Sequence, residues 1–238
     1  MTDKAQFVFN LAPRSAQGQE EFLVSDCNRE AVAWIDCWPD WPVKATGLNV
    51  HGEAASGKTH LAAVWRARSG AGLVDRAILS NEAVPGILSE NCDIVIDGLT
   101  RDWPGEPVLH LHNLIAERGG AVLILTRVPV ARMGLVPPDL SSRLSAMPAV
   151  AIGTPDDALI IGVMSKLFRD RQLQVGRDVL EYMTSRMRRS LAEAGRLVDL
   201  MDRRALAERR PITLPLARLA LAELMLEIDN DTPENRGE

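Results

Sequence analysis

A glycine-rich motif of the form G-x-x-x-x-G-K-[ST] restricts this chain more than any other feature of its sequence. An apolar strand pattern at 47–50 precedes the motif, and a helical pattern at 58–68 follows it. Glycines allow successive backbone N–H groups to turn onto phosphate oxygens, and the start of the helix adds the positive end of its dipole. The expected nucleotide-binding residues here are Gly52, Glu53, Ala54, Ala55, Ser56, Gly57, Lys58, Thr59 and His60.

Two side chains of the motif have separate expected roles. Lys58 would reach the β- and γ-phosphates, and the hydroxyl of Thr59 would ligate Mg²⁺. The alternative is a chance glycine-rich turn, but such a turn does not require a strand before it and a helix after it. The motif therefore predicts a site for ADP or ATP with Mg²⁺, and it accepts either nucleotide.

Composition restricts the class of protein. The chain has 238 residues, 46% of them hydrophobic and 25% charged, which is typical of a soluble globular protein. Its net charge of −5 argues against a surface that grips DNA directly. The sequence has no apolar run of about 18 residues and no signal peptide pattern, and Cys27, Cys37 and Cys92 lack metal-ligand spacing. We expect a cytoplasmic protein without a membrane segment.

A second acidic signature follows the phosphate loop. Residues 92–97 form an apolar run that ends at Asp97, which would support Mg²⁺ beside Thr59. An apolar strand that ends in aspartate is a weak signal alone, and its place one crossover after the loop strengthens it. Many such enzymes carry a second acid at the next position to orient the attacking water. Here that residue is Gly98, so we expect slow hydrolysis by the isolated chain.

The pattern of elements predicts a parallel three-layer α/β sheet followed by an all-helical lid. Further strands are expected near 73–79 and 121–125, and a helix over 107–118. At the end of the last strand, Thr126 is interpreted equally well as a strand cap or as a contact to the γ-phosphate. The expected organisation is a leader at 1–20, a nucleotide-binding domain at 21–153, a lid at 154–230 and a disordered tail at 231–238.

Two further segments each have two interpretations. A short helix around 139–144 carries Arg143, which is either a solvated charge or an arginine that reaches the nucleotide of a neighbouring subunit. The isolated apolar cluster in the leader is either a segment that docks on the protein's own core or a linear peptide for another protein's pocket. Spacing alone favours docking on the core. The residues of this cluster are Gln6, Phe7, Val8, Phe9, Asn10 and Leu11.

These features together resemble the AAA+ ATPases and, within them, the replication initiator DnaA and the Hda family of DnaA-related regulators. The resemblance is carried by the segment 22–28, the loop at 57–61, the strand that ends at Asp97, and the sequence Asp-Leu-Ser-Ser-Arg-Leu at 139–144. It implies that Phe22, Leu23, Val24 and Asn28 lie beside adenine. It also implies that Arg189 is the phosphate-contacting arginine of the lid, although Arg186 and Arg188 leave the register open.

The resemblance also implies partners. It suggests that Arg143 acts as an arginine finger on the nucleotide held by DnaA, and that residues 6–11 bind the DNA polymerase sliding clamp. The chain ends after the expected lid, where DnaA continues into a DNA-binding domain, so direct DNA binding is not expected. A homodimer or higher oligomer is left open. Two alternatives remain: an autonomous ATPase such as a DnaC-like helicase loader, which Gly98 argues against, and a DNA-binding initiator fragment, which the net charge argues against.

Overall fold

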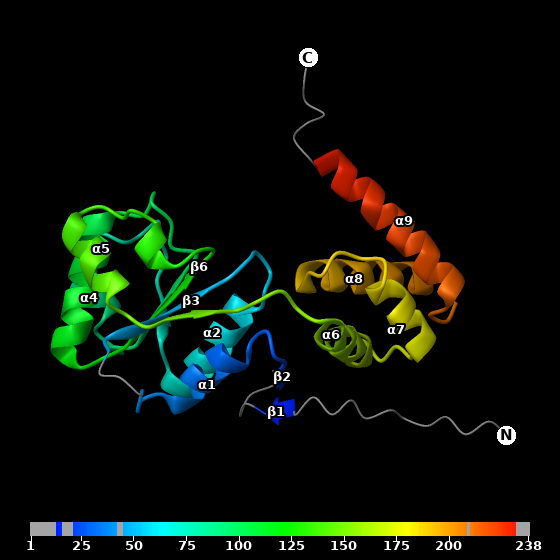
Figure 1. Ribbon diagram of the computed structural model, residues 1–238, viewed down its shortest axis with the longest axis horizontal. Helices are drawn as coiled ribbons and strands as arrows, with labels where there is room; N and C mark the ends of the chain where they lie inside the picture. The colour runs from blue at the N-terminus through cyan, green and yellow to red at the C-terminus, as the bar shows by residue number, and fades with distance from the viewer. Residues whose placement is uncertain (1–12, 16–20, 42–44, 209, 232–238) are drawn as a thin grey trace, which may run out of the picture. The chain divides into compact units, whose positions relative to one another are not determined.

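The computed structural model describes residues 13–15, 21–41, 45–208 and 210–231 (Figure 1). Within them the chain divides at Gly153 and Thr154 into two compact units. The first unit holds a β-sheet flanked by helices, and the second consists of helices alone. No described helix is both long and apolar enough to cross a membrane. The peptide predicted at residues 6–11 and most of the tail at 231–238 lie outside the described residues.

A five-stranded parallel sheet forms the centre of the first unit, with the strand order β4-β5-β6-β3-β7. Because β3 lies between β6 and β7, the sheet reverses its strand order beside the strand that leads into the glycine-rich loop. Ligands bind at such a switch point, outside the carboxyl ends of the strands. The strands are β3 (Gly47–His51), β4 (Gly72–Leu73), β5 (Ile94–Asp97), β6 (Val122–Thr126) and β7 (Ala149–Ala151).

Alternating side chains place an apolar layer on each face of the sheet. Val95 and Leu123 pack with α1 and α2, whereas Ile96 and Ile124 pack with α4 and α5. This confirms the predicted three-layer α/β arrangement, which can be followed in Figure 1. The helical elements of the unit are α1 (Arg29–Cys37), α2 (Lys58–Ser69), α3 (Val84–Ile87), α4 (Gly105–Arg118), η1 (Val130–Arg132) and α5 (Pro138–Ser145).

The strand predicted at 73–79 is wrong over most of its length. Only Gly72–Leu73 pairs with β5, and the chain then turns away from the sheet. The Asp75 carboxylate accepts a hydrogen bond from the Ala77 backbone N–H at 2.8 Å, which stabilises the turn that ends the strand. The apolar residues that suggested a strand instead anchor the loop, since Val74 and Leu79 are buried.

Four helices build the second unit around their own apolar core: α6 (Asp157–Asp170), α7 (Arg177–Thr184), α8 (Leu191–Glu208) and α9 (Leu214–Asp231). The carboxylate of Asp156 caps α6 by accepting a hydrogen bond from Leu159 N at 2.7 Å. Apolar residues at helical spacing bury one face of each helix, as the sequence predicts. Fully buried side chains in this core include Phe168, Met183, Leu197 and Met201.

A small antiparallel pair precedes the main sheet. Strand β1 (Pro13–Ser15) pairs with β2 (Glu21–Leu23), so part of the predicted leader has regular backbone structure. Strand β2 contains Phe22 and Leu23, the first two residues of the segment expected to lie beside adenine.

Candidate functional site

The glycine-rich loop has a backbone that only glycine suits at two points. A Cβ at Gly52 would collide with the carbonyl oxygen of Ile152, so the close approach of the loop to the end of β7 requires glycine. Gly57 has a φ of 98° and is the N-cap of α2, a left-handed conformation that side chains disfavour. The loop thus directs the start of α2 and its free N–H groups toward the carboxyl edge of the sheet.

Lys58 lies folded over the loop. Its Nζ donates hydrogen bonds to the carbonyl oxygens of Gly52 at 2.8 Å and Glu53 at 2.6 Å. Partial burial lowers the pKa of Lys58, while the carboxylates of Asp97 and Glu53 raise it and Arg127 lowers it further. The ammonium group is therefore fixed at the loop and only partly hydrated, which strengthens its attraction for an anion.

Thr59 and Asp97, the two residues predicted to ligate Mg²⁺, lie in contact. The Thr59 hydroxyl donates a hydrogen bond to Asp97 Oδ2 at 2.8 Å, although 38 residues separate them along the chain. Because β3, β5 and β6 are parallel, the start of α2, which carries Thr59, and the end of β5, which carries Asp97, lie at the same edge of the sheet. Within the described residues no group of three or more His, Cys, Asp or Glu side chains could hold a metal alone. The hydroxyl and carboxylate fit Mg²⁺ that takes its remaining ligands from phosphate and water.

The segment expected beside adenine lies against the start of α2. The ring of Phe22 stacks on His60 with centroids 5.2 Å apart and planes 16° apart. Asn28 is buried and accepts a hydrogen bond from Ser25 N at 2.9 Å, while its amide donates to Leu23 O at 3.0 Å. Asn28 thus fixes the turn that carries Leu23 and Val24, and its amide is engaged by this backbone.

A buried asparagine that the sequence analysis overlooked joins the two central strands. Asn49 is fully buried in β3, and its amide donates to Thr126 Oγ1 at 2.9 Å and to Ile124 O at 3.1 Å. Its side-chain oxygen accepts from Val130 N at 3.1 Å. Thr126 is buried as well, so the structure favours the strand cap over a contact to the γ-phosphate. A single amide inside an apolar strand is the signal that could have identified this link.

Basic groups gather at the carboxyl edge of the sheet. Burial lowers the pKa of His51, the last residue of β3, and the positive charges of Arg132 and Lys58 lower it further. Arg127 follows the tip of β6 and acts on Lys58 in the same way. In a chain with a net charge of −5, this local excess of positive charge suits a polyphosphate.

Position 98 lacks a carboxylate, and its backbone conformation also differs from the one that an acidic residue would favour. Gly98 has a φ of 74°, and a Cβ there would meet no atom within 4 Å. There is room for a side chain, but an L-residue would be strained at this φ. The loop is held by a hydrogen bond from Trp103 Nε1 to Gly98 O at 3.1 Å. Both the residue type and the backbone conformation at position 98 thus disfavour an acidic side chain there.

Arg143 lies exposed on α5, between the buried residues Leu140 and Leu144 that anchor this short helix. Its charge is close enough to His112 of α4 to lower the pKa of that imidazole, although burial is the larger cause. Within the described residues the Arg143 guanidinium forms no ion pair. The helix therefore presents a cation at the surface of the first unit.

The three candidate arginines of the lid have separate surroundings. Arg189 forms an ion pair with Asp157 at 3.0 Å. Arg186 lies over the ring of Tyr182, 4.0 Å from its centroid. The backbone N–H of Arg188 donates to Glu193 Oε2 at 2.8 Å. Arg189 thus differs from its neighbours in reaching α6, the helix that begins directly after the first unit.

Comparison with known proteins agrees with this geometry. Residues 157–221 match the family model described as "Hda, lid domain". The chromosomal replication initiator protein DnaA of Clavibacter sepedonicus is 23% identical over 237 residues, covering 90% of this chain and 50% of that protein. The chain therefore spans about half the length of the curated relatives it matches.

Solved structures show the same fold. Domain III of Thermotoga maritima DnaA has a TM-score of 0.72 and 16% identity, covering 85% of this chain and 94% of that one. AMPPCP-bound DnaA from Aquifex aeolicus has a TM-score of 0.61 and 16% identity, covering 79% and 68%. The parallel sheet with its phosphate loop and the helical lid define an AAA+ protein. Within that class, the chain is a DnaA-related protein with an Hda-like lid.

Proposed function

We propose that this chain is a cytoplasmic, nucleotide-binding regulator of replication initiation. It binds the sliding clamp and stimulates ATP hydrolysis on DnaA through Arg143. The exposed guanidinium of Arg143 on α5 is the observation that carries the proposal. The match of the lid to the Hda family model supports the regulatory role.

The chain's own nucleotide has a structural and permissive role in this account. Lys58 and the loop N–H groups would hold the phosphates of ADP or ATP, and Thr59 with Asp97 would hold Mg²⁺. Bound Mg²⁺ would neutralise phosphate charge at this site. Phe22 and His60 would flank the base, and Arg189 would approach from the lid. Nucleotide-bound DnaA structures among the similar proteins support this assignment.

Hydrolysis on DnaA needs positive charge at the transition state, and an arginine from a partner provides it. Such a finger raises the hydrolysis rate by roughly 10³–10⁵-fold. This chain lacks a carboxylate at position 98, and its Gly98 backbone does not suit one. A chain that turns over its own nucleotide slowly can still present Arg143 to another subunit.

Substitutions of Arg143 test whether this residue acts as an arginine finger. In an assay that contains DNA-loaded clamp, Arg143→Ala should leave nucleotide affinity unchanged and abolish stimulation of ATP hydrolysis by cognate DnaA. Arg143→Lys should retain little stimulation, because lysine lacks the planar, bidentate donors of arginine. Arg210→Ala, an exposed arginine of the lid, is the matched control and should stimulate like wild type. Full stimulation by Arg143→Ala would remove Arg143 from the mechanism.

Clamp binding is tested separately, because residues 6–11 lie outside the described residues. The resemblance to the Hda family favours Gln6, Phe9 and Leu11 as the anchors of a clamp peptide. Titration of fluorescent clamp should show binding that is lost when these three residues are changed to alanine. Equal binding by the variant would return the segment to a role in the protein's own fold.

An autonomous ATPase is the second candidate, favoured by the contact between Thr59 and Asp97, which would together hold Mg²⁺. It predicts substantial ATP turnover by the purified chain without DnaA or clamp, and loss of that turnover in Lys58→Ala. The regulator predicts slow turnover under the same conditions. One steady-state assay of the isolated chain therefore separates the two candidates.

A further inference from the structure

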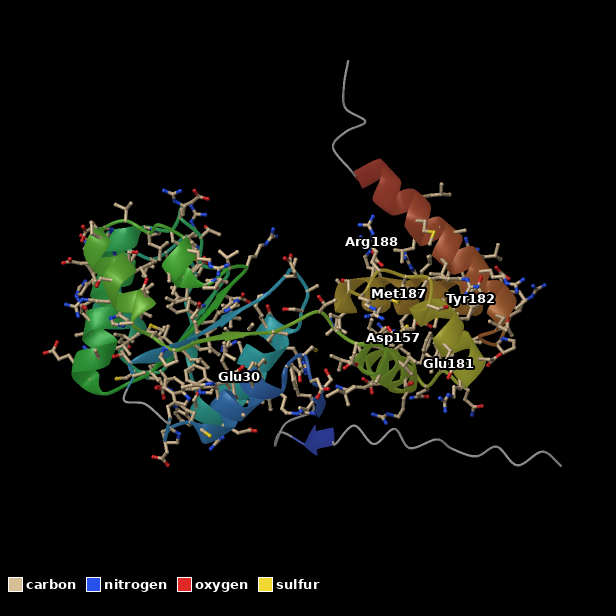
Figure 2. The ribbon with its side chains drawn as sticks, viewed as in Figure 1. Glu30, Asp157, Glu181, Tyr182, Met187 and Arg188 are labelled. Carbon is tan, nitrogen blue, oxygen red and sulfur yellow. The ribbon has the colours of Figure 1, made fainter. Side chains whose placement is uncertain are left out.

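A groove in the second unit lies between the turn that joins α7 to α8 and one side of α9. Its volume is about 180 Å³. A cavity of about 150 Å³ accepts a benzene molecule, so this groove has room for one large apolar side chain. Figure 2 shows Met187 and Arg188 in that turn. Apolar side chains form the floor of the groove and two arginines form its rim: Met187, Leu221, Leu224 and Met225, with Arg186 and Arg188.

The exposed side of α9 continues this apolar floor. Leu219 is 53% exposed, Met225 is 49% exposed and Leu226 is 65% exposed. With about 3.6 residues per turn, these three side chains share one face of the helix with the exposed Ala222. The solvent side of an amphipathic helix is normally polar. Adjoining apolar side chains on such a face, beside a groove, are typical of a surface that binds a partner.

Two arginines next to this face are held against one aromatic ring. The guanidinium of Arg186 lies 4.0 Å and that of Arg218 lies 5.7 Å from the ring centroid of Tyr182. Both arginines are exposed, and among the described residues neither forms an ion pair. A contact between a cation and a ring restricts the guanidinium without neutralising its charge. Both charges therefore stay available to an anionic partner.

Arg188 adds a third cation at the rim of the groove. Its side chain is 74% exposed, with Nε 4.0 Å from Glu193 Oε1. The other oxygen of Glu193 accepts the Arg188 backbone N–H at 2.8 Å, so this carboxylate is engaged in fixing the turn. Charge elsewhere on α9 is paired, since Glu223 forms an ion pair with Arg204 of α8. In a chain with a net charge of −5, the groove side of α9 is thus a local basic surface.

We propose that the groove and the exposed face of α9 form a docking site for an amphipathic helix of another protein, one that has an acidic flank. Apolar side chains spaced at i, i+4 and i+7 on that helix would pack along Leu219, Ala222 and Leu226, and one of them would enter the groove. Carboxylates on its flank would pair with Arg186 and Arg188.

The groove favours a helix over a lipid surface as the occupant. It is bounded by the turn on one side and by α9 on the other, so it suits a single inserted side chain. Complementary charge would fix the orientation of the bound helix, because the arginines border only the groove side of α9. This docking site involves neither Arg143 nor the nucleotide, and it goes beyond the proposed function.

A synthetic peptide of about 18 residues, long enough to form a helix, is the probe. It carries leucine at i, i+4 and i+7 and glutamate along one flank, and its binding to the full chain is followed by fluorescence anisotropy. The acidic peptide should bind in the micromolar range. A peptide with lysine in place of each glutamate should bind at least about tenfold more weakly. A third peptide, with proline in its centre, cannot form the helix and should not bind.

Variants of the chain test the two halves of the site separately. Arg186→Ala with Arg188→Ala should raise the dissociation constant of the acidic peptide at least about tenfold. Leu219→Ser with Leu226→Ser removes apolar contact without changing the arginines and should weaken binding as strongly. Arg210→Ala, which changes a lid arginine that is also 74% exposed, is the control and should bind like wild type. Circular dichroism verifies the folding of every variant.

Several results would overturn this assignment. The wild-type chain could fail to bind the acidic peptide, bind the lysine peptide equally well, or keep its affinity in both variants. Binding to phosphatidylglycerol vesicles without binding to the peptide would assign the face to a membrane. A change in sedimentation of the variants without a change in peptide affinity would assign it to a contact between copies. DnaA and clamp are absent from these experiments, so their failure would leave the proposed function untouched.

Discussion

At the scale of single residues, the contact between Thr59 and Asp97 gives a direct test of the proposed magnesium site. Thr59→Val keeps the shape of the side chain and removes the hydroxyl that donates to Asp97. Because Thr59 is exposed, the change in unfolding free energy should stay below about 1 kcal/mol. The gain in nucleotide affinity on adding Mg²⁺ should disappear in titrations with fluorescent ADP. Thr213→Val in the lid is the control, and an unchanged Mg²⁺ effect in Thr59→Val would contradict the assignment.

Gly98 provides a second residue-scale prediction. A Cβ at this position meets no atom within 4 Å, so Gly98→Ala isolates the effect of its positive φ. The substitution should lower the unfolding free energy by about 1 kcal/mol. Gly86 also has open space around it but lies in α3 without a positive φ, so Gly86→Ala should be neutral or stabilising. Equal effects in urea denaturation would show that strain is absent at Gly98.

Among the elements, β3, β6 and η1 are held together by one amide. Asn49→Ala removes the partners of Thr126 Oγ1, Ile124 O and Val130 N inside the core. Leaving such groups unpaired should lower the unfolding free energy by at least about 2 kcal/mol. Asn81→Ala changes an exposed asparagine and should have little effect in the same denaturation experiment. A small effect at Asn49 would mean that water replaces its hydrogen bonds.

Helix α4 carries a titratable group against the apolar core. Burial lowers the pKa of His112 from its usual 6.5, and Arg143 lowers it further, despite an opposing contact with Asn113. The unfolded chain therefore takes up this proton at a higher pH than the folded protein does. Stability should fall as pH drops below about 6.5 toward the lowered folded pKa.

The variant His112→Leu isolates this contribution. Its unfolding free energy should depend less on pH than that of wild type between about pH 5 and 7. His51, whose pKa is lowered in the same direction, accounts for part of the remaining dependence and is removed in His51→Gln. Thermal unfolding across this pH range measures both. Parallel pH profiles for wild type and His112→Leu would contradict the assignment.

What the sequence could predict differs from element to element. The phosphate loop, β5 and the lid helices depend on local signals, namely glycine spacing, a buried apolar run and helical periodicity. By contrast, β4 is short because a side chain–backbone turn at Asp75 competes with the strand pairing. Strand β7 has only three residues and exists because β3 offers it an edge, which no local pattern reveals.

In the candidate site, too, some residues could be nominated from local sequence patterns and others could not. Residue types at fixed spacing nominated Lys58, Thr59 and Asp97, because the chemistry of phosphate and Mg²⁺ restricts the residues that can bind them; their roles stay predictions. Asn49 was overlooked because its hydrogen bonds reach residues more than 70 positions away. The left-handed backbone of Gly98 likewise depends on contacts between loops that a linear pattern does not show.

At the scale of the whole molecule, nucleotide should stabilise the folded chain. A ligand that binds only the folded state at a concentration of about 100 times its dissociation constant adds about 2.7 kcal/mol to the unfolding free energy. ADP with Mg²⁺ should therefore raise the melting temperature of wild type. Lys58→Ala should remove this shift because the loop loses its cation. A shift that persists in the variant would place the nucleotide elsewhere.

The central claim is tested most directly by a single turnover of ATP already bound to DnaA. Hydrolysis would be followed with DnaA alone, with this chain added, and with this chain and clamp loaded on DNA. Hydrolysis should accelerate by orders of magnitude only when both this chain and the loaded clamp are present. An unchanged rate, with all components folded and nucleotide-bound, would contradict the assignment of this chain as a regulator of DnaA.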